Sequence, residues 1–186
     1  MQKCKGFSLI ELMVVIALLA IFVGIGIPSF NSMMNNNRSV ALANELMTAL
    51  NSARAEAIKR GKKVSVCPST DGSSCAGATS WASGWIVFVD TAASDLAASP
   101  VVGTVLSQKT GVAVGAEFAG ISSTDAAVAN GMSFVRFTGL GTAPLVPSDS
   151  TSASGFKVKF NGCSGSGARA VKLSRSGRVS ISRLSC

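Results

Sequence analysis

The sequence predicts an α+β fold in which one long N-terminal helix precedes a β domain. An apolar run fills residues 7–27, and an amphipathic helical period follows over residues 40–57. Beyond residue 62, short segments alternate apolar and polar residues with the period of two that strands have. The remaining chain, about 125 residues, is long enough to bury one core.

The apolar run has the length of a membrane span. It covers 21 residues with Glu11 as its only charge, and a bilayer core of about 30 Å takes about 20 helical residues to cross. Lys3 and Lys5 precede it, so the positive-inside rule leaves the N-terminus cytoplasmic and the rest outside. The plain alternative is a signal anchor in which Glu11 is incidental.

The helix is expected to continue beyond the apolar run. Pro28 can kink a helix without ending it, and Asn31 and Asn35-Asn36-Asn37 are poor helix formers, so we expect a soft stretch there. Helical periodicity returns after Arg38 in the apolar positions Val40, Ala43, Leu46, Met47, Leu50, Ala53 and Ala57. Gly61 then predicts the end of the helix. The prediction is a helix over 7–60, about 80 Å long, whose second half packs on a sheet.

Arg54 lies close to this apolar stripe, which is unusual for a cation.

After the helix, strands are expected at residues 64–67, 85–90, 101–106, 132–137 and 156–160. Trp85 and Phe88 are expected in the core. Ala/Ser/Thr-rich segments predict loops over residues 91–99 and 142–155.

The last apolar positions predict a hairpin. Leu173 can oppose Val179, and Val171 can oppose Ile181, if residues 175–177 form a three-residue loop. Gly177 can then take the left-handed conformation that such loops use.

This hairpin carries much of the positive charge. The formal net charge is +8, and residues 157–186 hold seven basic residues and no acidic one. The predicted register places Lys172 and Arg178 on the outer face, Arg175 at the tip, and Arg169 with Arg183 at the far end. We expect these cations to form one basic edge.

The chain has five cysteines, and four are left when residues 1–6, the short basic segment that contains Cys4, are set aside. They allow three pairings in an oxidising compartment, and proximity favours Cys67–Cys75 and Cys163–Cys186. Zinc is the alternative, but the usual C-x₂₋₄-C spacing is absent and the chain has no histidine.

The lack of histidine also excludes most enzyme classes. No Cys–His pair or Ser–His–Asp triad can be built without histidine, and separately no phosphate-loop motif of the GxxxxGK(S/T) type is present. The carboxylates outside the helix are scattered, at Asp71, Asp90, Asp95, Glu117, Asp125 and Asp149. We therefore expect no enzyme, no cofactor and no metal.

The N-terminal string Gly6-Phe7-Ser8-Leu9-Ile10-Glu11 resembles that of type IV prepilins. The resemblance implies cleavage between Gly6 and Phe7 by a prepilin peptidase, and N-methylation of Phe7. It further implies an inner-membrane protein with a periplasmic C-terminal domain that later joins a pilus at the cell surface. The partners implied are other minor and major pilins and the inner-membrane assembly platform.

Glu11 has a physical reason to guide assembly. After cleavage, the Phe7 amine and Glu11 are four residues apart on one helix face. The two charges either neutralise each other, or Glu11 meets the amine of a neighbouring subunit, because an unpaired charge in apolar surroundings is strongly disfavoured.

Further residues resemble the FimT/GspH family of minor pilins and pseudopilins. These are Ala-Arg54-Ala-Glu56-Ala, a strand ending Val66-Cys67, and Gly84-Trp85-Ile-Val-Phe-Val-Asp90. The family's helix packs on two antiparallel sheets, and its subunits sit near the filament tip. The implied organisation is a leader (1–6), a transmembrane and assembly half-helix (7–28), an amphipathic half-helix (29–61) and a β domain (62–186).

The resemblance implies two possible functions in a pilus, and one alternative function in a secretion system. The first is a FimU-like tip adaptor needed for pilus assembly. The second adds DNA contact during uptake, as in FimT-like pilins, through Lys172, Arg175, Arg178 and Arg183. Gly177-Arg178-Val179 resembles the basic tail motif of FimT-like pilins, but Ser180 stands where a second arginine is expected. The alternative is a minor pseudopilin, GspH-like, of a type II secretion system.

Overall fold

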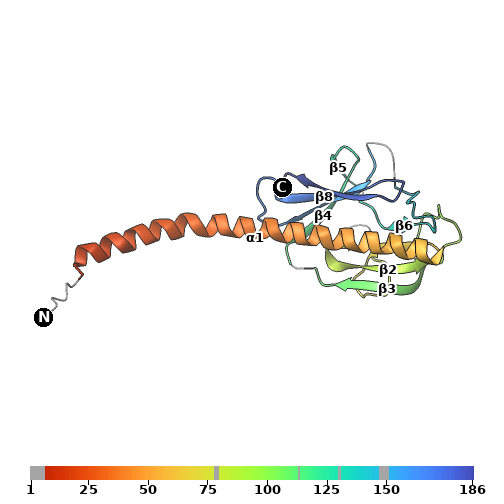
Figure 1. The fold of residues 1–186 in the computed structure, drawn as a ribbon, viewed down its shortest axis with the longest axis horizontal. Helices are drawn as coiled ribbons and strands as arrows, with labels where there is room; N and C mark the ends of the chain where they lie inside the picture. The colour runs from red at the N-terminus through yellow and green to blue at the C-terminus, as the bar shows by residue number, and fades with distance from the viewer. Residues whose placement is uncertain (1–6, 78–79, 113, 130, 147–150) are drawn as a thin grey trace.

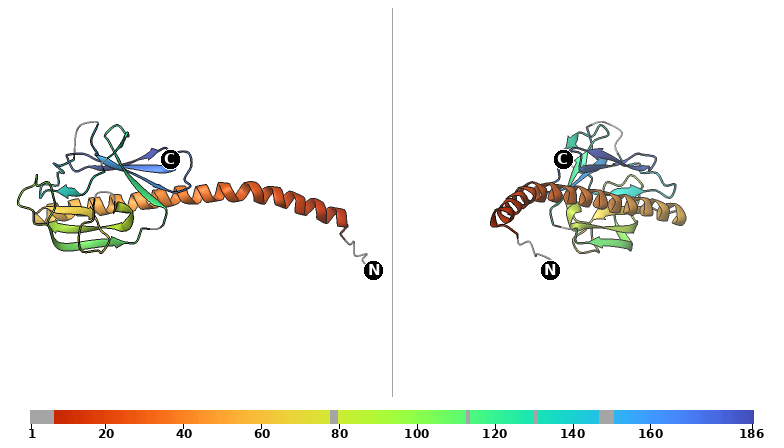
Figure 2. Two further views of the ribbon diagram at one scale, coloured as in Figure 1. Left: turned by 180° about the vertical axis from the view of Figure 1, so that it is seen from behind. Right: turned by 60° about the vertical axis from the view of Figure 1, so that its left-hand side comes forward.

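A computed structural model describes residues 7–77, 80–112, 114–129, 131–146 and 151–186, except the side chains of residues 25–29 and 80. One long helix, α1 (Leu9–Arg60), leads into a β domain of two antiparallel sheets (Figure 1). The first half of α1 projects from this domain and the second half runs along it, as two further views agree (Figure 2). The predicted leader, residues 1–6, lies outside the described residues.

Polar caps fix both ends of α1. The backbone N–H of Glu11 donates to Ser8 Oγ (3.2 Å), and the backbone N–H of Ser8 donates to Glu11 Oε2 (3.4 Å). This capping box starts the helix two residues later than predicted. At the other end, Gly61 takes the left-handed conformation (φ 61°), so the helix ends at Arg60 as predicted.

α1 runs uninterrupted through residues 35–37, where poor helix formers predict a soft stretch. Asn36 is held there by the β domain, because its side chain accepts from the Ser164 N–H (3.1 Å) and donates to the Ser164 carbonyl (3.2 Å). Ser39 Oγ accepts from the Phe160 N–H (3.0 Å). These tertiary hydrogen bonds offset the poor helix propensity of the asparagines.

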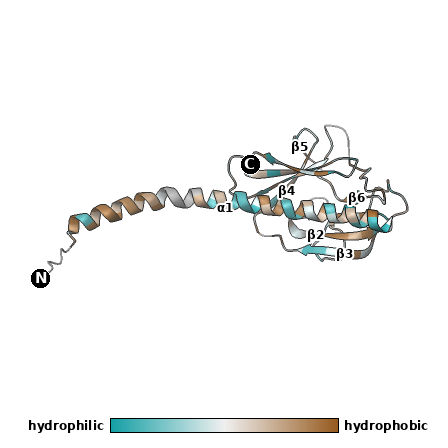
Figure 3. Ribbon diagram, viewed as in Figure 1, coloured by the Kyte–Doolittle hydropathy of each residue, from teal (hydrophilic) through white to brown (hydrophobic). Residues whose placement is uncertain are grey.

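The first half of α1 is apolar and uncovered. Between Phe7 and Val23, thirteen large apolar side chains are 44% to 81% exposed, and hydrophobic residues follow one another along this half (Figure 3). Among the described residues, no helical segment is both long and apolar enough to cross a membrane. The span predicted over residues 7–27 is therefore not shown, and it includes side chains outside the described part.

The β domain holds two sheets, with strand orders β3-β2-β1-β6 and β5-β4-β7-β8-β9. The first sheet contains β1 (Val64–Pro68), β2 (Gly84–Asp90), β3 (Val102–Thr110) and β6 (Val135–Phe137). The second contains β4 (Ala116–Ile121), β5 (Ala127–Val128), β7 (Gly155–Phe160), β8 (Ala168–Leu173) and β9 (Val179–Leu184). A short 3₁₀ helix, Ser80–Ser83, precedes β2.

Several strand boundaries differ from the prediction. β3 extends to Thr110, because its polar residues pair along β2, and β6 is shorter than the segment 132–137. The strands β4 and β5 were not predicted. β4 mixes Ala116, Glu117 and Gly120 with only two large apolar residues, so its sequence lacks a clear alternation, and its pairing with β7 defines it.

The core lies where α1 meets both sheets. Leu46, Leu50, Ala53 and Ala57 are fully buried on the inner face of the helix, as the periodicity predicts. Trp85 is buried in this main cluster. Phe88 is also buried, as predicted, but on the opposite face of its sheet in a smaller cluster with Cys67 and Ile86.

Candidate functional site

The N-terminal end presents an apolar helix with one carboxylate. Phe7 is 81% exposed, and Glu11 lies one turn further along α1 in its capping box with Ser8. The Ser8 N–H to Glu11 Oε2 distance of 3.4 Å is long for a hydrogen bond. The Glu11 side chain is exposed and is therefore only weakly held by this contact. The pattern Ser-x-x-Glu could have indicated the capping box from sequence.

Both disulfides join the cysteine pairs that proximity favours. Cys67 and Cys75 (Cα–Cα 5.5 Å) close a short loop after β1, and Cys163 and Cys186 (6.0 Å) tie the C-terminal residue to the loop after β7. That second loop also binds Asn36 of α1. The C-terminus is thereby fixed near the point where α1 enters the β domain.

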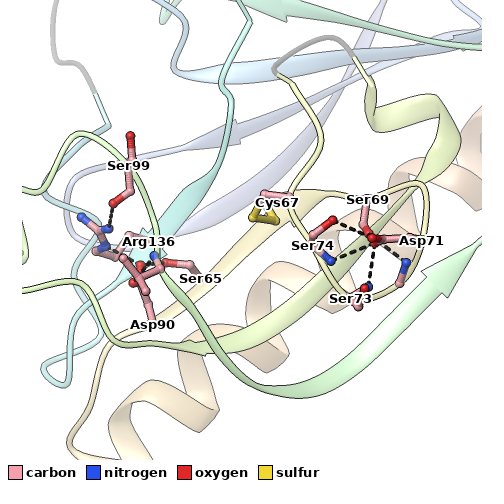
Figure 4. Close-up of a disulfide and its surroundings, with 12 residues drawn as sticks. Ser65, Cys67, Ser69, Asp71, Ser73, Ser74, Asp90, Ser99 and Arg136 are labelled. Atoms are coloured by element: carbon pink, nitrogen blue, oxygen red, sulfur yellow. Dashed lines mark hydrogen bonds and ion pairs between the residues drawn. A yellow bond between two sulfur atoms is a disulfide. The ribbon is translucent and has the colours of Figure 1, made fainter.

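Asp71 organises the loop that Cys67 and Cys75 close (Figure 4). Its carboxylate accepts hydrogen bonds from the Ser74 hydroxyl (2.6 Å) and from the N–H groups of Ser73 and Ser74 (2.8 Å each). The Ser74 hydrogen bonds hold the pKa of Asp71 well below its usual range. Among the described residues, no three His, Cys, Asp or Glu side chains lie together as a metal site would require.

A buried ion pair joins β2 to β6. Arg136 Nε donates to Asp90 Oδ2 (2.7 Å), and neither side chain is exposed (Figure 4). Asp90 also accepts from Ser65 Oγ (2.7 Å) and from two backbone N–H groups. Burial raises the pKa of Asp90, but these hydrogen bonds and the Arg136 guanidinium outweigh it and hold the pKa below its usual range.

The other nitrogens of Arg136 bind the loop over residues 91–99. They donate to the carbonyls of Ala97 (2.7 Å), Ser99 (3.0 Å) and Asp95 (3.2 Å). This pair therefore fixes the shape of an Ala/Ser-rich loop that has little local structure. The sequence gives no sign of the Arg136 partner, which lies 46 residues away.

The C-terminal hairpin has the predicted register. Val171 opposes Ile181 and Leu173 opposes Val179. Ser174 donates its N–H to the Arg178 carbonyl (3.0 Å), which leaves residues 175–177 as the loop, and Gly177 is left-handed at φ 77°.

The cations lie where the predicted register puts them, but they do not form one basic edge. Lys172 Nζ lies 2.6 Å from Asp125 Oδ2 and is paired. Arg175 and Arg178 are exposed at the turn, and Arg175 Nε donates to the Val146 carbonyl (3.0 Å). Arg183 is exposed at the opposite end of β9, five residues or about 17 Å along the strand from Arg178.

The position of Arg54 beside the apolar stripe is explained by its hydrogen bonds to two loops. Its Nε donates to the Gly141 carbonyl (2.9 Å), and its Nη2 donates to the Ser176 carbonyl (3.1 Å). The end of α1, the loop 138–142 and the hairpin turn therefore meet at the end of the β domain that lies farthest from the N-terminus. No sequence pattern predicts these backbone acceptors.

A free apolar half-helix with a carboxylate near its start, continuing into a helix packed on two antiparallel sheets, defines a protein of the type IV pilin class. Residues 1–27 match the model of the prokaryotic N-terminal methylation motif. Residues 42–177 match the family model of the type II transport protein GspH, and the chain belongs to this family.

One solved structure shows the same fold. The type IV minor pilin FimU of Pseudomonas aeruginosa (strain PAO1) has a TM-score of 0.53 and 20% identity, over 78% of this chain and 89% of FimU. A second crystal form of FimU gives a TM-score of 0.49 and 21% identity, over 76% and 90% of the two chains.

Proposed function

We propose that this chain is a minor type IV pilin that sits at the filament tip and primes or adapts pilus assembly. The observation that carries the proposal is the uncovered apolar half of α1 on a chain that begins with a methylation motif. An apolar surface of this extent requires a partner. The bilayer covers it before assembly, and the helices of neighbouring pilins cover it afterwards.

Processing supplies the charge that directs this exchange. A prepilin peptidase cleaves between Gly6 and Phe7, and Phe7 is then N-methylated. The new amine takes a carboxylate partner more strongly than the Ser8 N–H does, because ion-assisted hydrogen bonds are shorter and stronger. Glu11 therefore pairs with the amine of a neighbouring subunit as the helix leaves the inner-membrane platform.

Gene deletion and complementation test this role. We expect the deletion strain to lose surface pili and to regain them with the wild-type gene, while the Glu11→Ala gene fails to restore them. Ser32→Ala, on the same helix, is the control and should restore pili. Intact-mass analysis should find a chain that starts at methylated Phe7. Normal piliation of the deletion strain would rule the proposal out.

The alternative is a minor pseudopilin of a type II secretion system, which the family match itself favours. The same deletion strain distinguishes the two machines. The alternative predicts normal pili and the loss of secreted enzymes from the medium.

The proposal keeps DNA contact, but through two of the four cations expected from the sequence. Lys172 is neutralised by Asp125, and Arg183 is remote from the turn. The exposed cations Arg175 and Arg178 are the remaining phosphate ligands, and two of them give weak binding without sequence preference.

A further inference from the structure

The end of the β domain farthest from the N-terminus is built from four segments, which we name the distal face: residues 54–63, 91–99, 138–142 and 174–178. Arg54 ties three of them together, and Arg136 holds the fourth from beneath. A Cβ on Gly139 would come within 2.7 Å of the Gly61 carbonyl carbon, so these backbones touch. The distal face is therefore a preorganised surface, although loops form most of it.

Large apolar side chains stand exposed on this face. Leu140 is 87% exposed, Leu96 is 66% exposed and Ile58 is 53% exposed. A hollow of about 580 Å³ on this face has Leu140, Thr91 and Lys62 in its lining. One exposed leucine is ordinary, but three exposed aliphatic side chains on the tied segments of one face, with a hollow lined by one of them, indicate an interaction site.

The distal face is also strongly basic. Its seven cations are Arg54, Lys59, Arg60, Lys62, Lys63, Arg175 and Arg178, against the two carboxylates Glu56 and Asp95. Both carboxylates are already paired, Glu56 with Arg60 (2.6 Å) and Asp95 with Lys63 (3.8 Å). A face that combines exposed aliphatic side chains with an excess of cations favours a partner that brings apolar and acidic groups together.

We propose that the distal face docks a different pilin-class subunit through an acidic surface with an apolar centre, an inference that rests on the proposed function. A nucleic acid fits less well, because a phosphate backbone gains nothing from Leu140, Leu96 and Ile58. A second copy fits less well too. The opposite end of the β domain is also basic, with Arg38, Arg169 and Arg183, so stacked copies would repel each other.

Photo-crosslinking in assembled filaments tests this inference. The full chain carries a photoreactive amino acid at Thr91, which is exposed beside the hollow, and sheared filaments are irradiated and digested. We expect one main product, which joins this chain to another filament subunit through a peptide of net negative charge. Leu140→Asp and Arg178→Glu should each lower its yield about tenfold. Val114→Asp is the matched control at a fully exposed apolar residue away from this face, and it should leave the yield unchanged.

The other outcomes separate two failures. A product with a second copy, a product with DNA, or no product in filaments that contain the chain would overturn this inference and leave the proposed function intact. Absence of the wild-type chain from the filaments would overturn the proposed function and the inference with it.

Discussion

Asp90 and Arg136 show what a buried ion pair does in a domain with long irregular loops. Asp90 receives hydrogen bonds on both carboxylate oxygens, and the remaining N–H groups of Arg136 donate to loop carbonyls. Complete pairing is needed because an unpaired buried charge is strongly destabilising. The gain is a fixed conformation for residues 91–99, which carry Leu96 on the distal face.

Asp90→Asn should therefore lower the free energy of unfolding by about 3–5 kcal/mol. Urea unfolding in detergent, followed by tryptophan fluorescence, measures it. Glu117→Gln is the control, because its surface pair with Lys159 is exposed and worth about 0–1 kcal/mol. Equal losses in the two variants would contradict the assignment of a structural clamp.

The same carboxyl group sets an acid limit on stability. The pKa of Asp90 in the folded state lies below its unfolded value, so its contribution is present above the unfolded pKa of about 4. It is lost as the pH falls through the folded pKa. The free energy of unfolding of wild type should fall below about pH 4 more steeply than that of Asp90→Asn. Parallel curves for both proteins would exclude Asp90 as the titrating group.

Charge at the hairpin turn leads to a prediction about DNA. If only Arg175 and Arg178 contact phosphates, the logarithm of the binding constant should fall with the logarithm of salt concentration with a slope of about −1.8. Arg178→Ala should reduce the slope by about 0.9, and Lys172→Ala should leave it unchanged. A slope near −3.6, about twice the prediction, would show that all four cations bind and that the Lys172–Asp125 pair opens.

At the scale of elements, α1 and the hairpin β8–β9 could be predicted because local signals agree. The hairpin needed only four alternating apolar residues and one glycine in a three-residue loop. The helix needed its period and its stop at Gly61. β4 could not be predicted, because its apolar–polar alternation is weak and its pairing with β7 is what makes it a strand. The pairing of Lys172 could not be predicted for a related reason, since its partner Asp125 is 47 residues away.

The turn of the hairpin depends on Gly177. Its left-handed backbone strains any other residue, and an added Cβ would also collide with the Gly141 carbonyl oxygen. Gly177→Ala should therefore destabilise the protein by more than about 1–2 kcal/mol, the strain alone. Gly111→Ala isolates that strain, because Gly111 is left-handed (φ 65°) with no atom near its Cβ position. Equal unfolding free energies for the two variants would contradict the contact.

The disulfides should differ in their effect. In the chain-entropy model, the 23-residue separation of Cys163–Cys186 stabilises by about 3.4 kcal/mol and the 8-residue separation of Cys67–Cys75 by about 2.5 kcal/mol. Unfolding of the two double Cys→Ser variants measures the difference. Loss of Cys163–Cys186 should also speed amide exchange at position 186, where the backbone N–H donates to the Gly165 carbonyl (2.9 Å). A larger loss for the shorter loop would contradict this model.

At the scale of the whole molecule, α1 connects two surfaces that the described residues leave uncovered. The apolar half with Glu11 lies at one end, and the distal face lies at the other. The second half of α1 is the rigid link, buried against both sheets and tied to them by Asn36 and Arg54. This arrangement suits a subunit that joins a filament through its helix and carries another subunit on its head.

The most direct test of this account is to look for the chain in sheared, purified surface filaments with an antibody against the β domain. The account predicts the processed chain, beginning at Phe7, in small amounts and at one filament end by immunogold labelling. Glu11→Ala should abolish this labelling. The account would be contradicted if filaments lacked the chain while a strain without the gene kept normal pili and lost type II secretion.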